Sequence, residues 1–333
     1  MKSLYGRPLF TVDAEQFCWE DVVLDAARDG RWGRWEREVA AGAAALSAAQ
    51  AAERLDEDTV DGSAQEFRYA RDLITGQEME DWLDARGLSA PEWMGHIRRQ
   101  VAKTIMPPPG ALASLPPPAA DLLKVEWICS AASSEMATGL AERAAAAAAA
   151  PGAATWPVPP VPALREEILP DNAADRWRRL IAITEGEERF RRQSITPEAI
   201  RRDISHHHLD WIRIDCKMLS FDDAARAQEA ALCVREDGMV LDDVSADAHV
   251  PAFDSRFYLD ELDPDLRAVF LAAKPVDLIG PMLFEGSHTL FRILDKVMPH
   301  EQDPEIRRRA EQSVVARGRQ DEVNRRVRWH TSS

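Results

Sequence analysis

The sequence is poor in the features that anchor several common classes of protein. It has four cysteines in 333 residues (Cys18, Cys129, Cys216 and Cys233) and no CxxC pair. Cysteines this scattered argue against a disulfide framework and against a cysteine zinc site. The longest apolar run, the alanine tract at 144–150, is far shorter than the roughly 20 residues that a membrane-spanning helix needs. No transmembrane helix is therefore predicted.

The chain also has fewer positively charged than negatively charged residues. The chain has 41 Lys and Arg against 57 Asp and Glu, which gives a net charge of −16. Nucleic acids and anionic membranes bind clustered positive charge, so neither is expected as a partner. The N-terminal residues contain no hydrophobic signal core after Lys2. This absence predicts a cytoplasmic location.

Sequence motifs for bound cofactors and metals are missing as well. The chain has no phosphate-binding GxxxxGK[ST], no GxGxxG after a strand, no GxSxG elbow and no HExxH helix. Three consecutive histidines occupy positions 206–208, but neighbouring helical residues point about 100° apart and rarely converge on one ion. A pairing of His206 or His208 with His249 or Asp210 stays open as an alternative. We predict no cofactor and no metal.

Helical patterns interrupted by proline fill the first 203 residues. Apolar residues recur at helical spacing, and Thr75 and Ser89 each stand three residues before a glutamate, as at capped helix starts. The first hundred residues are predicted to be helical. Prolines gather at 107–118 and 151–170, where loops or semi-rigid connectors are expected. Residues 1–203 are interpreted as one helical lobe with proline-rich linkers.

The pattern changes to mixed strand and helix near residue 211. Ile212, Ile214 and Cys216 alternate with charged residues, which predicts a short strand. The pattern then predicts a helix at 221–235 and a strand or loop at 253–257. It predicts a second helix at 263–273 and a closing β-hairpin at 280–294. A last long helix begins near residue 303. This mixture beside the helical lobe predicts an α+β fold in at least two parts.

Two stretches of the mixed segment carry a recognisable pattern. They are Leu271-Ala-Ala-Lys-Pro-Val-Asp-Leu-Ile-Gly-Pro and Glu285-Gly-Ser-His-Thr-Leu-Phe-Arg-Ile, the second with His288 in a Gly-x-His pattern. Together with the order of strand, alanine-rich helix, short helix and hairpin, they resemble the parvulin family of peptidyl-prolyl isomerases. The resemblance covers about 211–299 and implies a parvulin-like β-α-β domain at 204–299.

The flanking parts resemble larger foldases that contain parvulin domains. Phe67-Arg-Tyr-Ala-Arg-Asp-Leu and Trp82-Leu-Asp-Ala-Arg-Gly-Leu are similar to the helical lobe of SurA-type and PrsA-type proteins, and the Asp303-Pro-Glu helix is similar to their tail. They are also similar to a cytosolic subgroup found with peptide natural-product maturation systems. The resemblance implies a SurA-like chaperone lobe at 1–203 and a C-terminal helix, 300–333, that packs on it.

The resemblance also implies a peptide site in the parvulin-like segment. The family usually carries a histidine on the first strand, and Asp215 or Cys216 stands in that place here. The domain is therefore interpreted as a degenerate parvulin. The polar candidates are His288, Cys216 and Asp215. The apolar candidates for the peptide pocket are Met218, Phe253, Phe257, Leu266 and Phe270.

Two of the polar candidates also have a purely structural interpretation. Cys216 has no base near it in the sequence and fits a small core residue. His288 fits a strand histidine that a backbone carbonyl satisfies. Prolyl isomerisation needs no bond to the substrate, because its barrier of about 18–20 kcal/mol falls wherever a site favours the twisted amide. An apolar pocket with a few oriented polar groups provides that preference.

Three functions follow as hypotheses. The first is a peptide-binding chaperone or foldase, favoured by the expected cytosolic location and by the missing first-strand histidine. The second is a working peptidyl-prolyl isomerase with an altered site. The third is an accessory subunit that presents a ribosomal precursor peptide to a modifying enzyme. The expected partner is an extended or proline-containing peptide, joined in the third case by the modifying enzyme.

Overall fold

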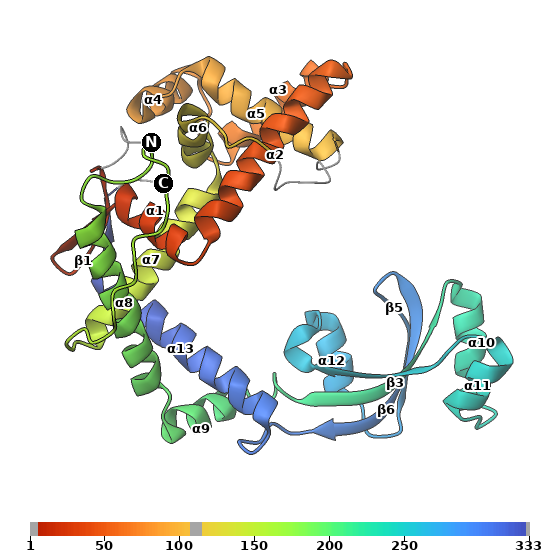
Figure 1. The fold of residues 1–333 in the computed structure, drawn as a ribbon. Helices are drawn as coiled ribbons and strands as arrows, with labels where there is room; N and C mark the ends of the chain where they lie inside the picture. Colours follow the sequence, from red (N-terminus) through yellow and green to blue (C-terminus); the bar gives the residue numbers. More distant parts are fainter. Residues whose placement is uncertain (1–5, 107–114, 331–333) are drawn as a thin grey trace. The chain divides into compact units, whose positions relative to one another are not determined.

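The computed structural model describes residues 6–106 and 115–330, and its contacts divide the chain into two units. Helices and two antiparallel sheets alternate along the chain, which confirms the predicted α+β fold (Figure 1). Most of the predicted linker at 107–118 lies outside the described residues. Unit 1 consists of residues 1–193 and 318–333. Unit 2 consists of residues 194–317.

Unit 1 is built mainly of helices. Thr75 and Ser89 cap two of them as predicted, each accepting a hydrogen bond from the backbone N–H of the glutamate three residues later. The helices are α1 (Trp19–Arg28), α2 (Arg31–Ala51), α3 (Glu57–Tyr69), α4 (Gly76–Arg86), α5 (Ala90–Ile105), α6 (Ala120–Cys129), α7 (Ala131–Ala149) and α8 (Ala173–Ser194).

The start of unit 1 corrects the prediction of an entirely helical first hundred residues. These residues begin with β1 (Pro8–Val12) and β2 (Glu15–Cys18), and β1 pairs on its other side with β7 (Val327–Trp329). Phe10 stacks on Phe17 across the first pair, with ring centroids 4.9 Å apart. Because β1 takes one partner from the far end of the chain, local periodicity does not reveal it.

Tryptophan side chains fill the core where the helices of unit 1 meet. The Trp127 ring of α6 lies 5.3 Å from Trp19, 5.3 Å from Trp32 and 5.1 Å from Trp35 between ring centroids. A second apolar cluster joins α3, α4, α5 and α6 around Phe67. The two clusters therefore meet at α6, which carries residues of both.

The proline-rich segment 151–170 is confirmed as a loop, and hydrogen bonds hold it to α8. Glu185 accepts a hydrogen bond from the backbone N–H of Thr155 at 2.8 Å. The indole Nε1 of Trp177 donates to the carbonyl of Pro159 at 2.7 Å. The segment is thus an attached strap of unit 1 rather than a free spacer.

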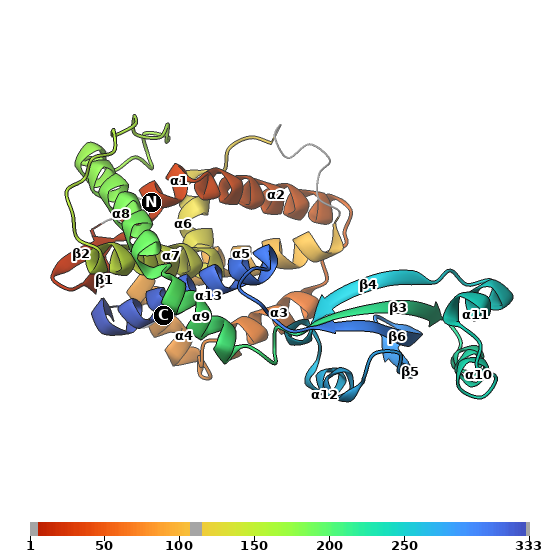
Figure 2. The same cartoon turned by 90° about the horizontal axis from the view of Figure 1, so that it is seen from below.

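Unit 2 contains a four-stranded antiparallel sheet in the order β4-β3-β6-β5. Figure 2 shows these strands running together, with α10 and α11 at one end of the sheet and α12 beside it. The predicted strand, helices and closing hairpin are confirmed. The elements are α9 (Pro197–His206), β3 (Arg213–Phe221), α10 (Ala224–Arg235), α11 (Leu241–Ala248), β4 (Phe253–Tyr258), the 3-10 turn Leu259–Glu261, α12 (Pro264–Ala272), β5 (Leu278–Phe284) and β6 (Ser287–Val297).

The last helix, α13 (Pro304–Arg326), belongs to both units. Its first half packs through Ile306 and Ala310 in a small cluster with α9 residues of unit 2. Its second half packs through Val323 against the core of unit 1. The sequence predicts boundaries after residues 203 and 299, whereas the contacts change after residues 193 and 317.

Candidate functional site

The sheet of unit 2 has two chemically different faces. Side chains alternate along β3, so Cys216 and Met218 lie on one face and Leu219 and Phe221 on the other. The second face is covered by α10 and α11, whose apolar side chains pack around Leu290 of β6. The first face is covered in part by α12. The first face is therefore the candidate site.

An aromatic cluster forms the base of this face. Phe270 of α12 lies between Phe257 of β4 and Phe291 of β6, with ring centroids 5.1 Å and 5.0 Å away and the rings edge to face. Phe284 of β5 adds a further edge-to-face contact with Phe291 at 5.2 Å. Such pairs stabilise beyond the area they bury, by about 0.5–1.5 kcal/mol each. The cluster is accordingly a rigid apolar core between α12 and the sheet.

Lys296 fixes the end of α12 to the sheet. Its Nζ donates to the carbonyl oxygens of Phe270, Leu271 and Ala273 at 3.0, 2.8 and 2.8 Å. These carbonyls belong to the last turn of the helix, where backbone acceptors lack helical partners. Burial of the ammonium lowers the pKa of Lys296. The contact holds α12 as a fixed wall of the site.

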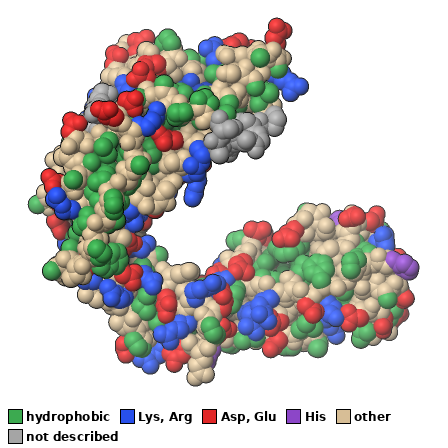
Figure 3. Space-filling model, viewed as in Figure 1, with side chains coloured by type: hydrophobic (Ala, Val, Ile, Leu, Met, Phe, Trp, Pro, Cys, Tyr) green, Lys and Arg blue, Asp and Glu red, His purple; other side chains and the backbone are tan. Residues whose placement is uncertain are grey.

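Beyond α12 the apolar face is open. Phe253 on the edge strand β4 stands opposite Met218 and is 48% exposed. Met282 and Phe284 of β5 are partly buried against the same cluster. In Figure 3, hydrophobic side chains gather over the part of unit 2 that holds α12 and β5. Exposed apolar surface joined to a core in this way is typical of a binding surface.

A pair of hydroxyl groups is set into this apolar face. Ser220 of β3 stands opposite Thr289 of β6, and their hydroxyl oxygens are 2.9 Å apart. Thr289 also stands opposite Met282 and is fully buried. One hydroxyl proton makes the bond between them, so the pair keeps a second proton to donate. A peptide carbonyl lying across the face is a suitable acceptor.

The structure brings the predicted apolar residues together. Met218, Phe257 and Phe270 belong to one buried cluster, and Leu266 of α12 packs against it from the side. Phe253 extends the same face through its pairing with Met218. Their role in peptide binding stays a prediction: Met218, Phe257 and Phe270 are buried core residues, and Phe253 is the exposed member of the set.

Cys216 and Asp215 do not form a polar pair. Cys216 is fully buried in the apolar cluster. Its burial, together with the charges of Asp215 and Asp254, raises the pKa of the thiol to about 12, so it stays protonated at neutral pH. Asp215 points to the other face and binds Arg213 and Arg256 at 3.1 and 2.9 Å. Burial raises the pKa of Asp215, but the hydrogen bonds and charges of the two arginines outweigh it and lower the pKa.

His288 also lies on the face opposite the apolar cluster. In the strand register it stands across from Phe221 on one side and Leu283 on the other. Asp215 is on that face too, but it pairs near the far end of β6, about seven residues from His288, or roughly 20 Å along the strand. The structure therefore does not bring the three polar candidates together.

Sequence reasoning missed several residues of the face. Four of them lie in the hairpin predicted at 280–294, and one lies on β3. Alternate residues of a strand share a face, so a period-two pattern extended through these strands would have indicated them. The missed residues are Ser220, Met282, Phe284, Thr289 and Phe291.

The described residues form neither a metal cluster nor a membrane-spanning helix. In residues 6–106 and 115–330, no group of three or more His, Cys, Asp and Glu side chains is placed to hold a metal ion. Among the same residues, no helix combines the length and the apolar character needed to cross a membrane.

Comparison with known proteins gives little further guidance. No protein-family model and no curated protein matches the sequence. A solved structure matches from a study of the virulence factor PEB4 and the periplasmic protein Cj1289, described as two structurally related SurA-like chaperones of Campylobacter jejuni. The match covers 98% of this chain and 99% of that chain, at 8% identity and a TM-score of 0.20. A TM-score this low does not establish a shared arrangement, so the proposals below rest on the residues of this chain.

Proposed function

We propose that the open apolar face of unit 2 binds an extended, proline-containing segment of a polypeptide, and that the protein is a peptide-binding foldase or chaperone. The observation that carries the proposal is the exposed Phe253 on the edge strand β4, which stands opposite Met218 of the buried apolar cluster. An apolar surface with a few placed polar groups is the usual form of a ligand site. Ser220 and Thr289 supply the polar groups.

The order of elements in unit 2 supports the same proposal. A strand, an alanine-rich helix, the short helix α12 and a closing hairpin follow one another, and the resemblance to parvulins rests on this order. A parvulin-like surface without the first-strand histidine suits binding better than catalysis. Cys216 holds its proton, Asp215 is ion-paired, and His288 faces away.

Two finer features of the proposal come from the resemblance: a degenerate parvulin domain, and a client that is a precursor peptide handed to a modifying enzyme. The proposed cytoplasmic location comes from the expected lack of a signal core. The net charge of −16 gives no basis for an anionic partner surface. A neutral or basic apolar peptide is the expected client.

The binding site is tested by NMR titration of a panel of apolar Xaa-Pro peptides. Phe253→Ser and Leu283→Ser form a matched pair, because both side chains are exposed, at 48% and 66%, and they lie on opposite faces of the sheet. Phe253→Ser is expected to weaken binding about tenfold, since a large apolar contact contributes about 1.5–3 kcal/mol. Leu283→Ser is expected to bind as the unchanged protein does. Equal binding by Phe253→Ser would overturn the proposed site.

An active isomerase is the second candidate, and the hydroxyl pair inside the apolar face is the observation that favours it. Uncatalysed prolyl exchange takes tens to hundreds of seconds. Exchange spectra of the same samples are expected to show no acceleration if the protein only binds. Acceleration that is lost in Phe253→Ser and kept in His288→Ala would establish the isomerase instead.

A further inference from the structure

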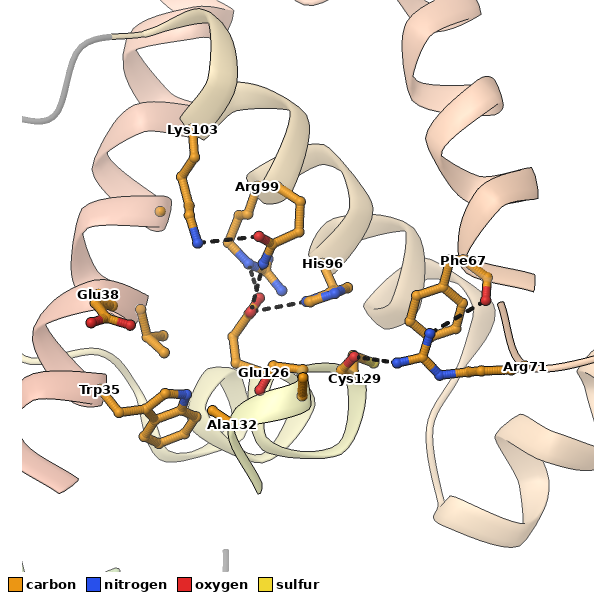
Figure 4. Close-up of a pocket in the computed structure, with 15 residues that line it drawn as sticks. Trp35, Glu38, Phe67, Arg71, His96, Arg99, Lys103, Glu126, Cys129 and Ala132 are labelled. Atoms are coloured by element: carbon orange, nitrogen blue, oxygen red, sulfur yellow. Dashed lines mark hydrogen bonds and ion pairs between the residues drawn. The ribbon is translucent and has the colours of Figure 1, made fainter. Parts of the chain in front are cut away.

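A cavity in unit 1 is independent of the sheet site. It has a volume of about 340 Å³ and lies among α2, α3, α5, α6 and the start of α7 (Figure 4). The aromatic residues that line the cavity are Trp35 and Phe67. Glu38 and Lys103, which are exposed, line the part of the cavity that faces solvent. Ligand pockets of small organic molecules begin at about this size.

A buried polar network lines one side of the cavity. Glu126 accepts hydrogen bonds from Arg99 Nε at 2.6 Å and from Gln100 Nε2 at 3.3 Å, and its Oε2 lies 2.9 Å from His96 Nδ1. His96 and Glu126 are each only 4% exposed. Both carboxylate oxygens of Glu126 thus have partners within the protein, and Arg99 balances the carboxylate charge.

The network leaves donors available at the cavity. Arg99 contacts Glu126 through its Nε and His96 contacts it through its Nδ1, and among the described residues the terminal nitrogens of Arg99 and the Nε2 of His96 have no hydrogen-bond partner. These nitrogens are not fully buried, so they are open to solvent or to a ligand that accepts hydrogen bonds.

The start of α7 adds further donors. This 19-residue helix begins at Ala131, after Ser130, whose side chain makes no capping hydrogen bond. Ser130 Oγ is buried and has no partner within the described chain. No acidic residue occupies the first turn. Ser130, Ala131 and Ala132 all line the cavity, so the positive end of the helix dipole faces it.

Positive charge prevails around the cavity. Arg71 and Lys103 remain after Arg99 is balanced by Glu126, and Glu38 is the opposing carboxylate among the lining residues. The Arg71 guanidinium lies 3.7 Å from the Phe67 ring centroid and donates to the carbonyl of Cys129 at 2.9 Å. Two positive charges against one give the cavity a net preference for a single anionic group.

We propose that this cavity binds a carboxylate attached to an aromatic or branched apolar group. The carboxylate is held by Ser130, the first N–H groups of α7 and the free donors of Arg99 and His96. The apolar group packs on the Trp35 side of the cavity. Both a free organic acid and the C-terminal residue of a peptide have this chemistry.

The ligand class is tested by calorimetric titration with N-acetylphenylalanine and with its amide, which lacks the charge. The acid is expected to bind and the amide to bind at least about tenfold more weakly, as for the loss of a hydrogen bond to a charged group. A peptide ending in Phe, as acid and as amide, identifies the source of the carboxylate. Equal binding of acid and amide, or no binding of either acid, would overturn the proposal.

Variants locate the ligand. Ser130→Ala is expected to lower affinity for the acid about tenfold without loss of stability, because the hydroxyl it removes is unpaired. Lys103→Gln is expected to weaken binding and Glu38→Gln to strengthen it. Arg98→Gln is the matched control, since Arg98 shares α5 but pairs with Glu57 outside the cavity. Affinity that is unchanged in Ser130→Ala and Lys103→Gln would place the ligand elsewhere.

Discussion

At the scale of single residues, Gly280 sets the shape of β5. Its φ is +100°, a value that suits glycine, and a Cβ at this position would lie 2.5 Å from the carbonyl oxygen of Thr289. The register between β5 and β6 shifts here, between Ile279 and Met282. This shift places Met282 opposite Thr289 on the candidate face.

We expect Gly280→Ala to lower the free energy of unfolding by about 2–3 kcal/mol, since it combines backbone strain with a clash. Gly286→Ala is the control, because Gly286 also has a positive φ but its Cβ would meet nothing within 4 Å. The control is expected to lose only about 1 kcal/mol. Denaturant unfolding measures both, and equal losses would show that the close approach to Thr289 is not limiting.

Glu126 predicts a pH dependence of stability. Burial raises its pKa, but the hydrogen bond with His96 and the charges of His96 and Arg99 outweigh burial and lower the pKa. A carboxyl group with a lowered folded pKa stabilises the protein above its ordinary value of about 4.3, and this contribution is lost as the pH falls through the folded pKa.

Glu126→Gln is therefore expected to lose stability at neutral pH and to show a shallower further decline below about pH 4.3. The measurement is the unfolding free energy as a function of pH for both proteins. Glu57→Gln, which removes an exposed ion pair with Arg98, serves as control and is expected to follow the unchanged protein. Parallel curves for Glu126→Gln and the unchanged protein would contradict the assignment.

The residues of the sheet site show what the sequence predicts and what it leaves open. Met218, Phe257 and Phe270 are expected from the resemblance to parvulins, and the structure places all three in one buried cluster. The face on which His288 lies depends on the register of β6 against β3 and β5, and a shift by one residue would turn it over. A Gly-x-His pattern contains no information about that register, so the sequence places the residue in the strand but not on a face.

At the scale of elements, the alanine tract has a packing role. Ala147 of α7 approaches Gly186 of α8 so closely that a Cβ on Gly186 would lie 2.7 Å from the Cβ of Ala147. Small residues on both helices permit this distance. The tract that looks like low complexity in the sequence is thus one side of a tight helix contact.

Gly186→Val is expected to destabilise the protein by about 2 kcal/mol through overpacking. Gly62→Ala in α3 is the contrasting change, because its Cβ would meet nothing within 4 Å and alanine favours a helix by about 1 kcal/mol over glycine. Thermal unfolding is expected to move in opposite directions for the two variants. A neutral Gly186→Val would mean that α7 and α8 separate without cost.

At the scale of the whole molecule, local patterns give the element types but not every partner. The predicted helices, the strand at 212–216 and the hairpin at 280–294 are present, because each follows from periodicity within about ten residues. The pairing of β1 with β7 joins residues more than 300 positions apart. Such a contact depends on where the chain ends meet in space, which periodicity does not report.

The separate cores predict how the molecule unfolds. The apolar clusters of unit 1 and of unit 2 share no residue, although α13 contributes to both units. Calorimetry is expected to resolve two transitions, since each unit has a core of its own. Gly186→Val should lower the midpoint of one transition and Gly280→Ala the midpoint of the other. If both variants shift one common transition, the continuous helix α13 couples the two cores strongly enough that they unfold together.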